Sequence, residues 1–201
     1  MDEFIYFHKS NLYISLTNSC TNNCVFCNVN DLSQSIGANL DLKQNPKFEE
    51  IIKELDEKIH NYSFKEIVFC GVGEPLLKLD NLLKVADYIN TKYFLTTRLN
   101  TNGHTYRIYK NRDVFQELKD AGVQTINVSM NATNEIDYNR ICRPKLKNAF
   151  FETINFVKKC KKNNLNVKIS FVDYNIDRTE CVSFSKNLGV EYFFRFLSQR
   201  T

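Results

Sequence analysis

The feature of this sequence that most constrains its fold is the alternation, along the whole chain, of short apolar runs with longer segments of helical periodicity. Runs of strand length followed by amphipathic helices are typical of repeated βα units, which build a parallel sheet. We therefore expect an α/β fold with parallel strands. The predicted strands are Leu12–Thr17, Glu66–Cys70, Tyr93–Asn100, Thr125–Met130, Asn166–Val172 and Val190–Leu197, and helices are expected after Pro46 and Asp80 and near Val114, Phe150 and Arg178.

Length and composition narrow the class of protein. A chain of 201 residues can bury one α/β domain but not two large ones, so we expect a single domain over residues 1–201. The net charge of +4 is modest and dispersed, which argues against a dedicated nucleic-acid binder, for which a basic stripe is expected, and it leaves room for an anionic substrate. No run approaches the roughly 18 apolar residues of a membrane helix, and the start Met1-Asp2-Glu3 lacks the basic region of a signal peptide. We expect a cytoplasmic protein.

Three of the seven cysteines, Cys20, Cys24 and Cys27, lie close together. Fully ligated iron–sulfur clusters use four cysteines, so three thiolates can hold such a cluster and leave one iron open for chemistry. The asparagines between them favour a loop, which can curl around a cluster. A zinc site completed by His8, His60 or His104 is the alternative, although none of these histidines has the usual ligand spacing. The remaining cysteines are interpreted as small apolar residues: Cys70, Cys142, Cys160 and Cys181.

Four polar or glycine-containing segments each follow the carboxyl end of a predicted strand. They are the cysteine loop, Gly71–Pro75, Thr101–Gly103 and Ser129–Asn131. In parallel α/β folds these strand ends open onto one face, where active sites lie, so we expect the four segments to surround one pocket. The connection Asn28–Gln44 is long and polar, and it is interpreted either as a substrate lid or as a surface excursion.

Within these segments, particular residues are candidates for ligand binding. The glycines Gly71 and Gly73 let the backbone approach a ligand, although an ordinary tight turn would contain the same residues. Ser129 and Asn131 have the same strand parity and are expected to point to the same side. Arg143, stiffened by the proline that follows it, is interpreted either as a grip for a carboxylate or phosphate or as plain surface charge.

Together these motifs resemble the radical S-adenosylmethionine (SAM) superfamily, whose signature is CxxxCxxC with an aromatic residue before the last cysteine, here Phe26. The resemblance implies a partial (β/α)6 barrel and a [4Fe-4S] cluster on the three cysteines, with SAM bound to the open iron. It implies SAM contacts by Phe26, Gly71, Gly73, Glu74, Asn102, Ser129, Asn131 and Arg143. It also suggests adenine contacts by Ile169, Phe171 and the backbone near Phe196.

A narrower resemblance covers nearly the whole chain. The runs Leu12–Asn18, Gly73–Leu77, Thr101–His104 and Ile141–Pro144 look like those of small radical SAM proteins associated with TatD-type hydrolases. This implies an enzyme that cleaves SAM to a 5′-deoxyadenosyl radical, which abstracts hydrogen from an unidentified substrate. An electron donor such as flavodoxin or ferredoxin and a TatD-type hydrolase are the expected partners. Two alternatives stay open, namely an activating enzyme for a glycyl-radical partner and a non-catalytic iron–sulfur or zinc protein.

Overall fold

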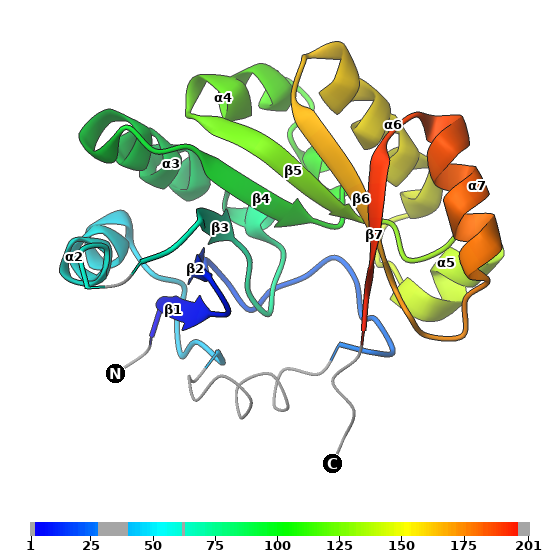
Figure 1. Cartoon of the computed structure of the whole chain (residues 1–201), viewed down its shortest axis with the longest axis horizontal. Coiled ribbons are helices and arrows are strands. Elements are labelled where there is room, and N and C mark those ends of the chain that lie inside the picture. Colours follow the sequence, from blue (N-terminus) through cyan, green and yellow to red (C-terminus); the bar gives the residue numbers. More distant parts are fainter. Residues whose placement is uncertain (1–2, 28–39, 62, 197–201) are drawn as a thin grey trace.

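The computed structural model describes residues 3–27, 40–61 and 63–196. These residues form a seven-stranded sheet in the order β1-β2-β3-β4-β5-β6-β7 (Figure 1). The strands β2 to β7 run parallel to one another, which confirms the predicted α/β fold with parallel strands. The strands are β1 (Ile5–His8), β2 (Asn11–Ile14), β3 (Glu66–Phe69), β4 (Thr97–Thr101), β5 (Val123–Ser129), β6 (Asn166–Val172) and β7 (Glu191–Arg195).

The strand β1 is absent from the sequence prediction. It pairs antiparallel with β2, and the turn between them contains Lys9 in a left-handed conformation, with φ of 55°. The helix that follows β2 fastens this strand, because the Glu54 carboxylate accepts a hydrogen bond from the amide of Phe4 at 3.0 Å. Such support comes from a residue about fifty positions away, so local sequence could not reveal it.

Helices cover one side of the sheet. Figure 1 shows α3, α4, α6 and α7 along the outer side of the curved sheet, where their apolar faces pack on the strands. The helices are α2 (Phe48–Lys58), α3 (Leu79–Tyr93), α4 (Val114–Asp120), α5 (Glu135–Cys142), α6 (Ala149–Lys162) and α7 (Arg178–Leu188), with short 3-10 turns η1 (Pro75–Lys78) and η2 (Thr105–Ile108). No helix in the described part of the chain is long and apolar enough to cross a membrane.

Two boundaries differ from the sequence prediction. The segment from Tyr93 was expected to begin a strand, but Tyr93 ends α3, and the left-handed Phe94 (φ of 56°) stops that helix before β4 starts at Thr97. The helix α5 was not expected, because its buried stripe is only Tyr138, Ile141 and Cys142. Asn134 caps it, since its side chain accepts a hydrogen bond from the Asp137 amide at 2.9 Å.

The two faces of the sheet differ in chemistry. Along β6, Ile169 and Phe171 are fully buried in the core toward the helices, whereas Lys168 and Ser170 line a cavity on the opposite face. Strand β5 repeats this alternation. Since successive side chains of a strand point to opposite faces, the predicted adenine contacts by Ile169 and Phe171 are wrong. The inner side of the partial barrel is therefore polar rather than a packed apolar core.

Candidate active site

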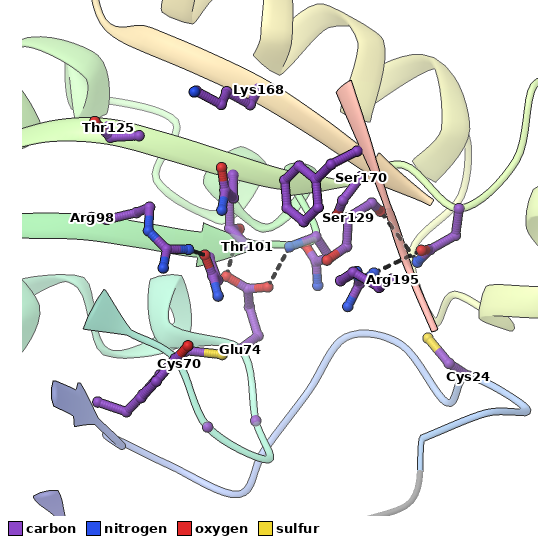
Figure 2. Close-up of a pocket in the computed structure, with 18 of the residues that line it drawn as sticks. Cys24, Cys70, Glu74, Arg98, Thr101, Thr125, Ser129, Lys168, Ser170 and Arg195 are labelled. Atoms are coloured by element: carbon purple, nitrogen blue, oxygen red, sulfur yellow. Dashed lines mark hydrogen bonds between the residues drawn. The ribbon is translucent and has the colours of Figure 1, made fainter. Parts of the chain in front are cut away.

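A cavity of about 670 Å³ lies on the inner side of the sheet (Figure 2). This volume is within the usual range of ligand-binding pockets. Two described residues of the predicted site, Cys27 and Arg143, do not line it. The structure brings the other predicted residues together around the cavity: Cys20, Cys24, Phe26, Gly71, Gly73, Glu74, Asn102, Ser129 and Asn131.

The cysteine loop is held in place by the end of α5 and the residues after it. Backbone groups of the loop bond to backbone groups of residues 141–145, and the Lys145 ammonium also donates to the Cys20 carbonyl at 3.0 Å. The backbone bonds join Val25 N to Ile141 O (2.9 Å), Asn23 N to Cys142 O (3.1 Å) and Lys145 N to Thr21 O (2.8 Å). Residues 141–145 therefore position the cysteines, a role that the sequence did not reveal.

Arg143 belongs to this support rather than to the cavity wall. Its backbone is left-handed, with φ of 45°, and its amide closes α5 by donating to the Asn139 carbonyl at 3.1 Å. Its side chain lines a separate hollow together with Pro144. The structure therefore does not place Arg143 where the sequence prediction needs it. Cys27 is exposed beside Cys24, whose carbonyl accepts its amide at 3.0 Å.

The chemistry of the three thiols fits a metal cluster. Burial raises the pKa of Cys20 to about 11, and burial and the neighbouring Cys24 raise the pKa of Cys27. A hydrogen bond to the Cys142 thiol and burial raise the pKa of Cys24. Buried, clustered thiols of this kind ionise readily only when a cation compensates their charge, and a bound metal does so. A donor set of three thiols fits a [4Fe-4S] cluster that keeps one iron without a protein ligand.

A zinc site finds no support among the described residues. No three His, Cys, Asp or Glu side chains of the described ranges converge as ligands of one ion. The cysteines of a [4Fe-4S] cluster bind separate irons, so they need not converge in that way. His104 is fully buried, with Nδ1 3.2 Å from the Tyr138 hydroxyl, His60 lies at the end of α2 against Tyr93, and His8 is on β1.

The two glycines after β3 allow a close approach to the chain that leads into the cysteine loop. The Gly73 amide donates to the Thr17 carbonyl at 3.1 Å, and a Cβ on Gly73 would stand 2.2 Å from that oxygen and 2.5 Å from the Ser19 carbonyl oxygen. A Cβ on Gly71 would stand 2.2 Å from the Ser15 hydroxyl oxygen. The glycines thus serve packing against residues 15–19, in addition to the ligand approach that the sequence suggested.

Glu74 joins two walls of the cavity. Its buried carboxylate accepts hydrogen bonds from the Thr101 hydroxyl at 2.7 Å, the Asn102 amide at 2.8 Å and the Leu76 amide at 3.1 Å. Burial raises its pKa to about 7 in spite of these bonds, each of which lowers it. Because the three donors belong to the chain, Glu74 mainly positions the segment after β3 against the end of β4.

The Asn102 side chain is also used within the protein. Its amide nitrogen donates to the Thr21 hydroxyl at 2.7 Å, and its oxygen accepts from the Thr105 hydroxyl at 3.0 Å. Thr21 directly follows Cys20, so this network fixes the start of the cysteine loop to the end of β4. Asn102 therefore lines the cavity while its polar atoms are bonded to the fold.

Ser129 and Asn131 reach the cavity by different routes. Strand β5 ends at Ser129, and Asn131 is in a left-handed turn with φ of 58°, so strand parity does not place its side chain. The Asn131 oxygen accepts hydrogen bonds from the Val172 amide at 3.2 Å and from Arg195 Nη2 at 2.8 Å. Asn131 thus ties β6 and β7 to the end of β5.

Arg195, at the end of β7, is a residue that the sequence interpretation missed. It lines the cavity, and its buried Nε has no hydrogen-bond partner in the described part of the chain. Burial lowers the pKa of Arg195, whereas the thiols of Cys70, Cys24 and Cys142 act to raise it. Arginine keeps its charge in proteins, so a half-buried cation, whose buried Nε has no partner among the described residues, faces the cysteine end of the cavity. Figure 2 shows Arg195 and Cys24 at this same end.

Comparison with known proteins shows which family the chain resembles. Residues 14–176 match the Radical SAM superfamily. A probable GTP 3′,8-cyclase of Methanocaldococcus jannaschii is 28% identical over 182 residues, which cover 89% of this chain and 55% of that protein. A dual-specificity RNA methyltransferase RlmN of Francisella tularensis is 27% identical, over 81% of this chain and 44% of that protein. The chain thus spans about half the length of the curated relatives it matches.

Solved structures show the same fold. SuiB of Streptococcus suis bound to SAM matches with a TM-score of 0.69 and 13% identity, over 96% of this chain and 41% of that one. The anSMEcpe protein with bound AdoMet matches with a TM-score of 0.68 and 15% identity, over 93% and 52%. The superfamily match spans the cysteine loop, and it confirms the expected cofactors, a [4Fe-4S] cluster and SAM. With its three-cysteine loop at the carboxyl end of a partial barrel, the chain belongs to the radical SAM superfamily.

Proposed function

We propose that this protein is a radical SAM enzyme that removes a hydrogen atom from a substrate held in the cavity. The observation that carries the proposal is the position of Cys20 and Cys24 on the wall of the 670 Å³ cavity, which Arg195 also lines. When bound and reduced, the cluster and SAM together supply a 5′-deoxyadenosyl radical, which takes the hydrogen atom.

Different residues of the chain would bind the cluster and SAM. Cys20, Cys24 and Cys27 would hold the cluster and leave one iron without a protein ligand. Arg195 would bind the SAM carboxylate through Nε, which has no partner among the described residues, because a guanidinium is a strong donor to a carboxylate. Ser129 would offer its hydroxyl to the same cofactor from the end of β5.

The other predicted residues would shape the site. Gly71 and Gly73 present backbone rather than side chains to the cavity, which suits a contact with the SAM amino group. Glu74, Asn102 and Asn131 hold the ends of the strands in place through the hydrogen bonds described above. Their polar atoms are bonded before a ligand enters, so the pocket is preorganised.

The names of the relatives do not identify the substrate or the protein partners of this chain. An electron donor such as flavodoxin or ferredoxin, a TatD-type hydrolase and a glycyl-radical partner stay predictions from the sequence. A co-purification of the tagged protein with each candidate would test these partnerships separately from the chemistry.

The test of the function is reductive SAM cleavage. Protein reconstituted with iron and sulfide without oxygen, then given SAM and dithionite, should form 5′-deoxyadenosine. Cys24→Ala should lose both the iron and the product, whereas Cys160→Ala, which changes a thiol in the helical core, should keep both. A wild-type protein that holds its cluster and forms no 5′-deoxyadenosine would instead be a non-catalytic iron–sulfur protein.

A further inference from the structure

The half of the cavity that lies at the amino ends of the strands carries polar and basic side chains that SAM binding does not explain. Arg98, Thr125, Asn127 and Lys168 line it, and Lys9 reaches it from the turn between β1 and β2. Figure 2 shows Arg98, Thr125 and Lys168 away from Cys24. From Thr125 to Ser129, the four-residue length of β5 separates the two ends by roughly 13 Å. The cavity is therefore long enough to hold a second ligand at the end away from the cysteines.

The backbone register gathers these side chains. Asn127 of β5 is paired with Asn100 on one side and with Lys168 on the other, and Arg98 is paired with Thr125. All of them occupy the strand positions that alternate with the buried apolar ones. The pattern is therefore a polar patch across three neighbouring strands, β4, β5 and β6, and not a set of isolated surface charges.

The charge of this patch is positive. Arg98 donates through Nε to Glu66 at 3.0 Å and through Nη1 to Asn100 at 2.6 Å, which leaves Nη2 for a ligand. Lys168 Nζ pairs with Glu191 at 2.6 Å, but the Glu191 side chain is 73% exposed. An ion pair with such an exposed partner contributes little, so Lys168 can exchange it for a bound anion at small cost.

The patch also contains an unused acceptor. The Asn127 side chain, 9% exposed, has an amide oxygen with no hydrogen-bond partner among the described residues. Buried polar atoms in folded proteins are normally bonded, so a ligand that completes this site brings an N–H or O–H group. An apolar ligand would leave this buried oxygen without a hydrogen-bond partner, which is costly.

We propose that this patch binds a small organic oxyanion, a carboxylate or a phosphate, that also carries a hydroxyl or amino group, and that this anion is the substrate class of the enzyme. The assignment of this anion as the substrate rests on the proposed function. Arg98 and Lys168 hold the oxyanion, Asn127 accepts from the hydroxyl or amino group, and the rest of the molecule extends toward the cysteine end.

Calorimetric titration of the cluster-loaded protein, with SAM present and no reductant, tests the inference. The probes are ribose 5-phosphate, malate and neutral ribose. At least one of the two anions should bind, and the tighter one tells whether phosphate or carboxylate is preferred, whereas ribose should not bind measurably. Lys168→Gln should weaken the binding of that anion tenfold or more. Lys158→Gln, which removes a charge from the exposed face of α6, should leave it unchanged.

Folding is controlled in the same experiment. Lys9→Gln changes an exposed turn that cannot disturb the core, and it should weaken anion binding several-fold; the melting temperature and iron content of each variant are measured alongside. The inference is overturned if neither anion binds more tightly than ribose, or if Lys168→Gln and Lys9→Gln both bind the anion like wild type. Because the titration contains no reductant, its result is separate from that of SAM cleavage. A protein that cleaves SAM and binds neither anion contradicts this inference alone.

Discussion

The Thr101 hydroxyl donates a hydrogen bond of 2.7 Å to the buried carboxylate of Glu74. This contact joins the last residue of β4 to the segment after β3, and both residues line the cavity. The segment that contains Glu74 was expected to contact a ligand, and this hydrogen bond shows that it also fixes the end of β4 beside the cavity.

Removing that donor should destabilise the fold. Thr101→Val keeps the shape of the side chain but leaves the buried Glu74 carboxylate one hydrogen bond short, so we expect a loss of about 1–3 kcal/mol of unfolding free energy. Urea denaturation measures this loss. Thr179→Val, at an exposed position of α7, serves as the control and should change stability by less than about 0.5 kcal/mol. Equal stabilities of the two variants would contradict the role given to Thr101.

Glu74 should make the stability of the cluster-free protein depend on pH. Its pKa is raised from 4.5 to about 7 by burial, so the folded protein binds the proton more tightly than the unfolded chain. The stabilisation is complete below pH 4.5 and is lost as pH rises to about 7, a change of roughly 3 kcal/mol. Denaturation at a series of pH values measures this slope. Glu74→Gln should flatten it, and a variant with the wild-type slope would show that another group causes it.

The two glycines after β3 should differ in their tolerance of a methyl group. In Gly73→Ala the new Cβ would meet two backbone carbonyl oxygens just before Cys20, so the cysteine loop must move and iron incorporation should fall by half or more. In Gly71→Ala the obstacle is the Ser15 side-chain hydroxyl, which can rotate away. Iron and sulfide counts on both variants check this order. Equal iron contents would mean that the close approach does not position the loop.

Arg195 should tune both cofactors. Arg195→Gln removes a half-buried positive charge from the cysteine end of the cavity, so SAM should bind at least tenfold more weakly, and the cluster should become harder to reduce. Equilibrium binding and a redox titration followed by electron paramagnetic resonance (EPR) give the two values. Arg140→Gln, an exposed arginine on α5, should change neither. If the reduction potential is unchanged in Arg195→Gln, the cation does not act on the cluster.

A substitution of Cys142 distinguishes a cluster with one open iron from a cluster with four cysteine ligands. The Cys142 thiol hydrogen-bonds with the thiol of Cys24, a predicted cluster ligand, and accepts a hydrogen bond from the Asn131 amide at 3.6 Å. If it only packs there, Cys142→Ala should keep the iron and sulfide content of wild type. Loss of the cluster from Cys142→Ala would make it a fourth ligand and would leave no iron for SAM.

The cysteine loop and the segments beginning at Gly71 and Thr101 could be predicted from the sequence because the carboxyl ends of parallel strands meet at one edge of a sheet. Asn131 lines the cavity as predicted, although a left-handed turn rather than strand parity places it there. The position of Arg143 could not be predicted, because its left-handed backbone turns its side chain away from the strand pattern. For Arg143 this turn leads out of the cavity altogether. A polar residue after a strand therefore predicts where the site lies, but it does not predict whether that residue's own side chain lines the cavity.

Strand parity carried information that the sequence interpretation did not use. Lys168 and Ser170 alternate with Ile169 and Phe171, and helices cover the apolar face, so the polar positions had to face the cavity. Strand β7 lacks this alternation, because Phe193 lines the cavity together with Arg195, so the pattern does not single out Arg195. The support of the loop by residues 141–145 could not have been foreseen, because it consists of backbone hydrogen bonds between segments more than a hundred residues apart.

The most direct test of the account is the EPR spectrum of the dithionite-reduced cluster with and without SAM. If Cys20, Cys24 and Cys27 leave one iron open to the cavity, SAM should bind that iron and change the spectrum. The change should be absent when SAM is replaced by adenosine, which lacks the methionine group that binds the iron. A spectrum that is the same with and without saturating SAM, from protein that holds a complete [4Fe-4S] cluster, would contradict the account.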